Sequence, residues 1–287
     1  MKRLSFLTIL ICMLYSYSGA AQETAQAENS LPGGFDTVMV YKQTGETSLK
    51  LYVFYPSDYK INNNHASIIF YFGGGWNGGS LTQFEPHAKH LASLGMVSVL
   101  ADYRVRSRHG TTPFEAVADA RSAIRFLKIH AEKLRIDPEK MVAAGGSAGG
   151  HLAACTAFLQ GLDEPGEDLS VTTVPAALVL YNPVIDNGPD GYGYERMGER
   201  YREISPAHNI REGLPPVIFF LGTSDRLIPV ATAEKFKHDM EKAGNRCDLF
   251  LFEGQPHGFF NFRNTENYQS TLLKTVDFLK SLKLVSQ

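Results

Sequence analysis

Residues 141–155 read MVAAGGSAGGHLAAC, an apolar run followed by a glycine-rich turn and a stretch typical of a helix. Ser147 lies at the centre of the turn, with Gly145 two residues before it and Gly149 two residues after it. This is a G-x-S-x-G pattern, in which small neighbours leave space for a serine held in a strained strand-to-helix turn. The pattern predicts that the Ser147 hydroxyl projects from the end of a strand at a helix N-terminus and acts as a nucleophile. A glycine-rich phosphate loop is the alternative reading of the same letters.

Short apolar runs, typical of strands buried on both faces, recur on either side of this turn. Helical patterns alternate with them, one after Pro113 and one over Tyr268–Leu282. Two further runs, Thr37–Lys42 and Ser48–Tyr55, predict an N-terminal antiparallel hairpin. The chain is therefore expected to form an α/β fold, a mostly parallel sheet with helices on both faces. The remaining predicted strands are Ser67–Phe72, Met96–Ala101, Met141–Ala144, Ala176–Tyr181, Val217–Leu221 and Asp248–Phe252.

Two residues that could activate Ser147 follow consecutive predicted strands. Asp225 comes just after Val217–Leu221, and His257 just after Asp248–Phe252. The carboxyl ends of parallel strands share one edge of a sheet, where sites gather. A serine hydroxyl is a weak nucleophile, so it needs a base, and the base needs a carboxylate to orient it. We therefore predict Ser147, His257 and Asp225 as a catalytic triad, with Asp186 as the alternative acid.

A third element of such a site would be a pocket for an oxyanion. Residues 72–76 read FGGGW and follow a predicted strand directly. Consecutive glycines let backbone N–H groups turn toward the site, so we expect Gly74, Gly75 and Ala148 to donate to the oxyanion. Each such donor can lower the barrier by ~3 kcal/mol.

These motifs together resemble those of the α/β-hydrolase superfamily, in its esterase/lipase branch with an HGGGW-like oxyanion loop and a GxSAGG nucleophile elbow. The five pieces are Gly73-Gly74-Gly75-Trp76, Asp102-Tyr103-Arg104, Gly145-Gly146-Ser147-Ala148-Gly149-Gly150, Asp225 and His257. The resemblance covers about Leu51 to Leu282. It implies an α/β-hydrolase fold and ester hydrolysis without a cofactor. One position departs from the family, since Phe72 stands where a histidine usually helps to fix the oxyanion loop.

The segment Val184–Ser205 is the candidate for a short cap loop over the site. It is rich in glycine and charge and lacks the apolar stripe of a lipase lid. Tyr192, Tyr194 and Trp76 are expected to offer flat faces to a sugar ring. With the family resemblance, which extends to secreted carbohydrate esterases of the acetyl xylan and feruloyl type, this predicts removal of acetyl or similar small acyl groups from a glycan. A serine exopeptidase and a catalytically silent binding module on the same fold stay open as alternatives.

Charge and the first residues suggest where the protein acts. Lys and Arg total 28 against 30 Asp and Glu, so a cationic surface for nucleic acid or anionic membrane is not expected. Lys2 and Arg3, an apolar run and small residues up to Ala21 predict a signal peptide over 1–21. We expect a tether over 22–34, a single domain over 35–287, and a secreted or periplasmic location.

Three weaker patterns allow other interpretations. Gly73–Gly78 also matches G-x-G-x-x-G, and Asp102 follows at about the sequence separation of the acidic residue that contacts the ribose in dinucleotide-binding domains. However, no helix begins inside the motif, as dinucleotide binding requires. His87 and His90 have the spacing of two helical metal ligands, yet a solvated helix face explains them better. Asp102 and Arg104 are expected to form a structural ion pair.

Overall fold

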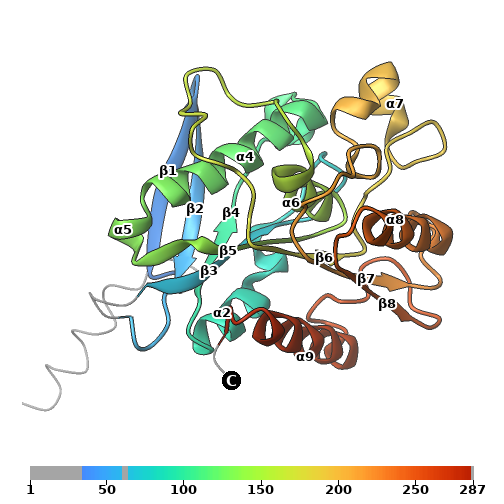
Figure 1. Cartoon of the computed structure of the whole chain (residues 1–287). Helices are drawn as coiled ribbons and strands as arrows, with labels where there is room; N and C mark the ends of the chain where they lie inside the picture. The colour runs from blue at the N-terminus through green and yellow to red at the C-terminus, as the bar shows by residue number, and fades with distance from the viewer. Residues whose placement is uncertain (1–33, 60–63, 286–287) are drawn as a thin grey trace, which may run out of the picture.

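The computed structural model describes residues 34–59 and 64–285, and its central feature is one sheet of eight strands (Figure 1). The strands are β1 (Thr37–Thr44), β2 (Thr47–Phe54), β3 (His65–Tyr71), β4 (Val97–Ala101), β5 (Ile136–Gly146), β6 (Ala177–Tyr181), β7 (Val217–Gly222) and β8 (Cys247–Phe252). Their order across the sheet is β1-β2-β4-β3-β5-β6-β7-β8. The predicted signal peptide and nearly all of the predicted tether lie outside the described residues.

The strand pairing matches the predicted fold class. β1 pairs antiparallel with β2, and β2 antiparallel with β4, whereas every other neighbouring pair is parallel. The predicted mostly parallel sheet with an N-terminal hairpin is thus confirmed. Strand bounds differ from the predicted ones by a few residues. The largest difference is at β5, which begins at Ile136 rather than Met141. Ile136 pairs with His65, and the residues 137–140 that follow lie at a register shift, outside the apolar run on which the prediction rests.

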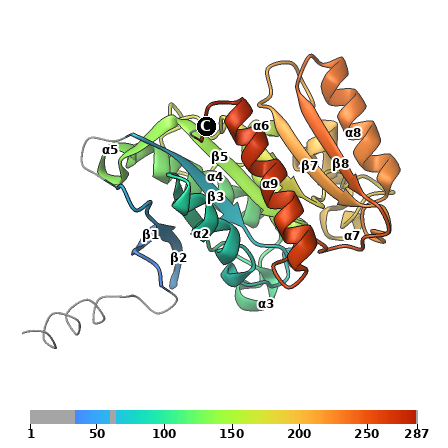
Figure 2. The same ribbon diagram turned by 90° about the horizontal axis from the view of Figure 1, so that it is seen from below.

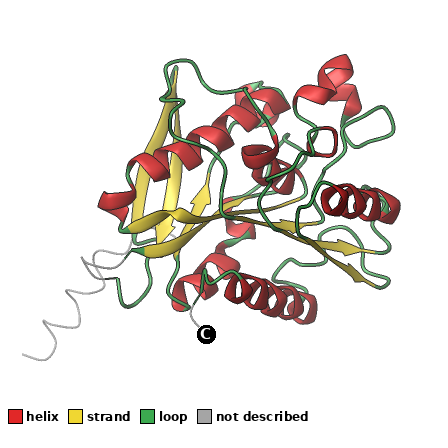
Figure 3. Cartoon of the chain, viewed as in Figure 1, coloured by secondary structure: helices red, strands yellow, loops and turns green. Residues whose placement is uncertain are grey.

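Helices cover both faces of the sheet (Figure 3). They are α2 (Glu85–Ser93), α3 (Arg106–His109), α4 (Pro113–Ile129), α5 (Ala131–Leu134), α6 (Ala148–Phe158), α7 (Tyr194–Met197), α8 (Val230–Lys242) and α9 (Thr265–Ser281), with 3₁₀ turns η1 (Leu81–Gln83), η2 (Gly198–Glu203) and η3 (Pro206–His208). One apolar core joins α4, α6 and α8 to one face of the sheet, and a second joins α2 and α9 to the other face (Figures 1 and 2). No helix among the described residues has the length and apolarity to cross a membrane.

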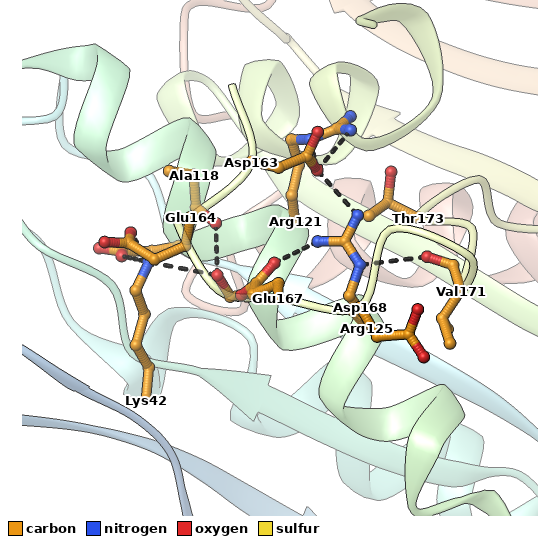
Figure 4. A network of polar contacts seen from close by, with 12 residues as sticks. Lys42, Ala118, Arg121, Arg125, Asp163, Glu164, Glu167, Asp168, Val171 and Thr173 are labelled. Atoms are coloured by element: carbon orange, nitrogen blue, oxygen red, sulfur yellow. Dashed lines mark hydrogen bonds and ion pairs between the residues drawn. The ribbon is translucent and has the colours of Figure 1, made fainter. Parts of the chain in front are cut away.

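An ion-pair network ties the segment after α6 to α4 and β1 (Figure 4). Arg121 and Arg125 on α4 both pair with Asp163 at 2.8 Å, and Arg125 also pairs with Glu167. Lys42 on β1 pairs with Glu164 from the same segment. Both arginine side chains are nearly buried. Buried charges are stable only when they are paired, so the network holds this loop in one place.

The predicted ion pair between Asp102 and Arg104 is wrong. Arg104 pairs instead with Asp119 on α4 at 2.7 Å, and Asp102 pairs with Arg108 at 2.7 Å. The Asp119 side chain is fully buried, so it requires cationic partners. Arg104 meets that requirement, whereas Asp102 lies closer to solvent, within reach of α3.

The interpretation of His87 as part of a solvated helix face is also wrong. His87 is fully buried on α2, and neither ring nitrogen has a hydrogen-bond partner among the described residues. Its neighbours are aromatic rings, namely Phe70, Phe84, Tyr181, Phe260 and Tyr268. Burial lowers the pKa of His87 to about 3, so the ring is neutral and packs as an aromatic residue. Within the described ranges, no cluster of His, Cys, Asp or Glu could hold a metal ion.

Candidate active site

Ser147 occupies the turn between β5 and α6 in a strained conformation. Its φ is 55° and its ψ is −120°, a region that side-chain-bearing residues rarely adopt. Gly149 explains why the turn needs small residues, because a Cβ there would overlap the carbonyl oxygens of Tyr71 and Phe72. A hydrogen bond of 2.9 Å from the Ser147 N–H to the Tyr181 carbonyl also joins the turn to the end of β6. Sequence and geometry therefore agree that this turn presents the serine at the carboxyl edge of the sheet.

The structure brings Ser147, His257 and Asp225 together from the ends of three strands. His257 Nε2 lies 2.9 Å from Ser147 Oγ, and His257 Nδ1 lies 2.6 Å from Asp225 Oδ2. The Asp225 side chain is fully buried, and its other oxygen accepts the N–H groups of Leu227 and Ile228 at 2.8 and 3.0 Å. Those two bonds fix which oxygen faces the imidazole. The carboxylate therefore accepts a hydrogen bond from the Nδ1–H group, which leaves Nε2 unprotonated and able to take a proton from the serine.

Asp186, the alternative acid, lies away from His257. One of its oxygens accepts the Gly188 N–H at 2.8 Å and lies 3.7 Å from His208 Nδ1. Ser205 Oγ is 2.9 Å from that same Nδ1. Because a single ring nitrogen faces both the hydroxyl and the carboxylate, this second grouping cannot pass a proton across the ring as His257 can.

The glycine loop, residues 73–75, lies against the serine turn. A Cβ on Gly73 would come within 3.3 Å of Ser147 Cβ. Gly74 and Gly75 have φ values of 131° and 59°, conformations in which glycine is strongly favoured. Among the described residues, none accepts a hydrogen bond from the N–H of Gly74 or Gly75. Ala148 begins α6, and N–H groups of a first helical turn have no intrahelical acceptor.

Phe72 is buried and packs where the family resemblance implies a histidine. Its ring stacks on Tyr103 with centroids 4.2 Å apart, and the Tyr103 hydroxyl donates to the Phe72 carbonyl at 2.7 Å. A Cβ on Gly79 would overlap the Phe72 ring, so the loop closes directly over that ring. Packing thus supports the start of the glycine loop at this position without a polar side chain.

A cavity of about 300 Å³ opens over the serine. Its lining residues are Gly73, Gly74, Gly75, Asn77, Gln83, Ser147, Asn182, Tyr192, Arg196, Leu227, His257, Gly258, Phe260 and Asn261. Of the three aromatic residues predicted to contact substrate, only Tyr192 lines it. Tyr194 contacts Glu199 and Tyr201 instead.

The prediction that Trp76 offers a flat face to a sugar ring is wrong, because Trp76 is only 2% exposed. Its ring packs edge-on against His151, 5.0 Å away, and beneath Gly193 of the cap segment. Burying so large an apolar ring is favourable, and the cap supplies the cover. His151 is itself fully buried, with Nε2 2.7 Å from the Ile204 carbonyl oxygen.

Several cavity residues were missed from the sequence, Asn182 above all. It is fully buried directly after β6, and its Oδ1 accepts the Gly258 N–H at 2.8 Å. Its Nδ2 lies 3.3 Å from His257 Nε2. Its place after a strand at the site edge was a usable signal. Arg196, which donates to the Gly75 carbonyl from α7, carried no comparable signal.

Known proteins with related sequences are esterases. A family model described as BD-FAE matches residues 51–187, and a model for the dienelactone hydrolase family matches residues 172–282. A probable isoprenylcysteine alpha-carbonyl methylesterase of Oryza sativa subsp. japonica is 28% identical over 76% of this chain and 56% of its own length. An acetylxylan esterase of Xylanibacter ruminicola is 28% identical over 77% of this chain and 46% of its own length. The chain thus spans about half the length of these curated relatives.

Solved structures give a fuller match. Thermogutta terrifontis esterase 2, phosphoramylated by tabun, superposes with a TM-score of 0.85 at 45% sequence identity. The match covers 88% of this chain and 96% of that one. The propionate-bound form of the same esterase matches with a TM-score of 0.84. This likeness, over almost all of the related chain and on the same fold, means that the protein belongs to the esterases of the α/β-hydrolase superfamily.

Proposed function

We propose that the protein hydrolyses small acyl esters of carbohydrates through an acyl-enzyme formed on Ser147. The observation that carries this proposal is the unbroken line of hydrogen bonds from Ser147 through His257 to Asp225, at the floor of a cavity that the glycine loop also lines. Each group in that line has the partner its role requires.

The first half of the reaction forms the acyl-enzyme. His257 Nε2 takes the hydroxyl proton as Ser147 Oγ attacks the ester carbonyl carbon. The carbonyl oxygen becomes an oxyanion, which the N–H groups of Gly74, Gly75 and Ala148 stabilise. The tetrahedral intermediate collapses when the bond to the alcohol oxygen breaks, and His257 returns its proton to that oxygen.

The second half releases the acid. Water takes the place of the alcohol, His257 removes one of its protons, and the resulting hydroxide attacks the acyl carbon. Collapse of the second tetrahedral intermediate breaks the bond to Ser147 Oγ, which takes back the proton from His257. Asp225 keeps its negative charge throughout and stabilises the imidazolium.

The cavity favours a small acyl group. Its volume of about 300 Å³ is at the lower end for ligand pockets, and a long alkyl chain would find few apolar partners in it. The carboxamide of Asn77 supplies a donor and an acceptor that suit the hydroxyls of a sugar. Structures of the related Thermogutta terrifontis esterase 2 are propionate-bound and butyrate-bound, which supports short acyl chains. The 28% identical acetylxylan esterase supports a glycan as the alcohol part.

The place of action follows from the first residues of the chain. The predicted signal peptide over 1–21 would deliver the domain to the periplasm or the medium, where plant polysaccharide is accessible. Its removal can be tested by N-terminal sequencing of the protein recovered from a culture's periplasmic and extracellular fractions. A mature N-terminus near residue 22 is expected, and recovery only from the cytoplasm would contradict export.

A substrate panel tests the proposed reaction. We expect hydrolysis of p-nitrophenyl acetate to exceed that of the octanoate and palmitate, and release of acetate from acetylated xylan or of the acid from a feruloylated sugar. Preference for palmitate, or no acid released from any glycan, would refute the carbohydrate assignment. Faster cleavage of aminoacyl amides than of esters would favour an exopeptidase.

Covalent labelling separates an enzyme from a binding module. A fluorophosphonate probe is expected to label the wild type at Ser147 and to leave Ser147→Ala unlabelled. Ser147→Ala and His257→Ala should each lose most activity while remaining folded, and the double variant should be little worse, because the residues act as one unit. Near wild-type turnover in Ser147→Ala would show that the nucleophile is another residue.

A further inference from the structure

A chain of carboxamide side chains joins the glycine loop to His257. We propose that Gln83, at one end of this chain, is the residue that positions the glycine loop for the reaction. The inference rests on the proposed function, since it assigns a positioning residue to the same site.

The first part of the chain lies beside the serine. Gln83 Oε1 accepts the N–H of Gly73 at 2.7 Å, and Gln83 Nε2 donates to Asn261 Oδ1 at 3.0 Å. A Cβ on Gly73 would lie 3.5 Å from Gln83 Oε1 and 3.3 Å from Ser147 Cβ. The Gln83 amide therefore contacts the glycine loop at the point where the loop meets the serine.

The second part reaches the base. Asn261 Nδ2 donates to the Gly258 carbonyl at 2.7 Å, the Gly258 N–H donates to Asn182 Oδ1 at 2.8 Å, and Asn182 Nδ2 lies 3.3 Å from His257 Nε2. In Gln83 and Asn261 the oxygen accepts and the nitrogen donates, so neither amide can be flipped without losing both of its bonds. In Asn182 the oxygen accepts from Gly258, and this bond sets the nitrogen beside His257 Nε2.

The glycine loop needs hydrogen bonds from outside because its three glycines do not fix their own backbone conformation. Three consecutive glycines can adopt many backbone conformations, and the peptide planes of Gly74 and Gly75 must be held for their N–H groups to face one point. Phe72 packs at the start of the loop but cannot form a side-chain hydrogen bond. Gln83 accepts the hydrogen bond of Gly73 at the end of the loop beside the serine, whereas Arg196 donates to Gly75 at the other end. A carboxamide does not titrate, so the bond to Gly73 persists at every working pH.

The central test is Gln83→Met, which keeps the length of the side chain and removes both hydrogen bonds. We expect kcat on p-nitrophenyl acetate to fall about 10–100-fold, less than or equal to the loss of one oxyanion donor, with KM changed less than about twofold. The matched control is Gln269→Met, a glutamine exposed on α9, which should match the wild type. Wild-type kcat in Gln83→Met would overturn the proposal, and so would a raised KM with unchanged kcat, which would make Gln83 a substrate contact.

A second variant separates positioning from mere packing. In Gln83→Glu, a protonated carboxyl group can accept from Gly73 and donate to Asn261 as the amide does, whereas a carboxylate cannot donate. The activity of this variant, divided by that of the wild type at each pH, should therefore rise as pH falls through the pKa of the introduced group. A ratio that does not change with pH would show that the hydrogen bonds of Gln83 do not set the rate.

Amide hydrogen exchange gives a readout that needs no turnover. The peptide spanning residues 72–80 should exchange faster in Gln83→Met than in the wild type and in Gln269→Met, while the rest of the protein is unchanged. Unchanged exchange of this peptide would refute the tie. If the proposed function were wrong, the wild type itself would hydrolyse no ester. That result differs from an unchanged kcat or an unchanged exchange rate in Gln83→Met, which would refute only the role of Gln83.

Discussion

Asp225→Asn offers a sharp test of how the base is prepared, because the structure dictates how the new amide must lie. One oxygen of Asp225 accepts the N–H groups of Leu227 and Ile228, and the other faces His257 Nδ1. In the variant, the amide oxygen must stay with the two backbone N–H groups, so the NH₂ faces Nδ1. Nδ1 then has to accept, and the ring proton moves to Nε2. A nitrogen that already carries a proton cannot take one from Ser147.

The expected loss is large although the site stays intact. A triad held in the wrong tautomer loses about 10⁴-fold in kcat, which corresponds to about 5 kcal/mol of transition-state stabilisation. The fold should be preserved, because the buried side chain keeps both of its backbone hydrogen bonds.

The assay is kcat for p-nitrophenyl acetate, with thermal unfolding measured on the same preparations. Asp186→Asn is the matched control, since that carboxylate also follows a strand, accepts one backbone N–H and lies near a histidine. We expect it to retain activity within about twofold of the wild type. A loss below about tenfold in Asp225→Asn, or an equal loss in both variants, would refute the tautomer argument.

Two further predictions concern pH and stability. Unfolded His87 gains a proton below its ordinary pKa of 6.5, whereas folded His87 stays neutral down to about 3, so the wild type loses stability as pH falls through that window. His87→Phe removes this loss. The free energy of unfolding of the variant relative to the wild type should therefore rise by up to about 1.4 kcal/mol per pH unit as pH falls, measured with urea at several pH values. A difference that does not change with pH would contradict this prediction. At Asp163, burial raises the pKa, but hydrogen bonds from Arg125 and Arg121 outweigh it and lower the pKa below 3.8. The stabilisation from this carboxylate is complete above pH 3.8 and disappears as pH falls through the lowered value, so Asp163→Asn should be less stable than the wild type at pH 7 and converge with it in acid; a deficit that persists in acid would be inconsistent with the ion pairs.

The sheet and the triad could be read from the sequence because both depend on local patterns. A strand buried on both faces is a continuous apolar run, and helices between such runs imply parallel neighbours. Ser147, Asp225 and His257 each come within a few residues of the end of a strand, and parallel strands end at one edge of the sheet. Their meeting therefore follows from topology alone, although they are far apart in sequence.

Burial of single residues was harder to predict. His87 was assigned to a solvated face, yet it lies three residues after Phe84 and four before Leu91, both of them buried, so it belongs to the apolar stripe of α2. A histidine side chain favours an exposed position, whereas this spacing favours a buried one, and the spacing is the better guide. Trp76 had no such signal, because its cover comes from Gly193 of a segment more than a hundred residues away.

The hydrogen bonds among Gln83, Asn261 and Asn182 could not be predicted from local sequence patterns. Gln83 and Asn261 are 178 residues apart. Gln83 ends the short turn η1 and Asn261 lies in a loop, and no periodicity describes either segment. Their hydrogen bond depends on how α2 and α9 pack on the same face of the sheet, since η1 leads into α2 and the His257 loop leads into α9. Packing of the apolar core thus sets the alignment of the polar groups over the serine. A core substitution between these two helices should accordingly disturb the glycine loop before it disturbs Ser147 and Asp225, which follow the ends of β5 and β7.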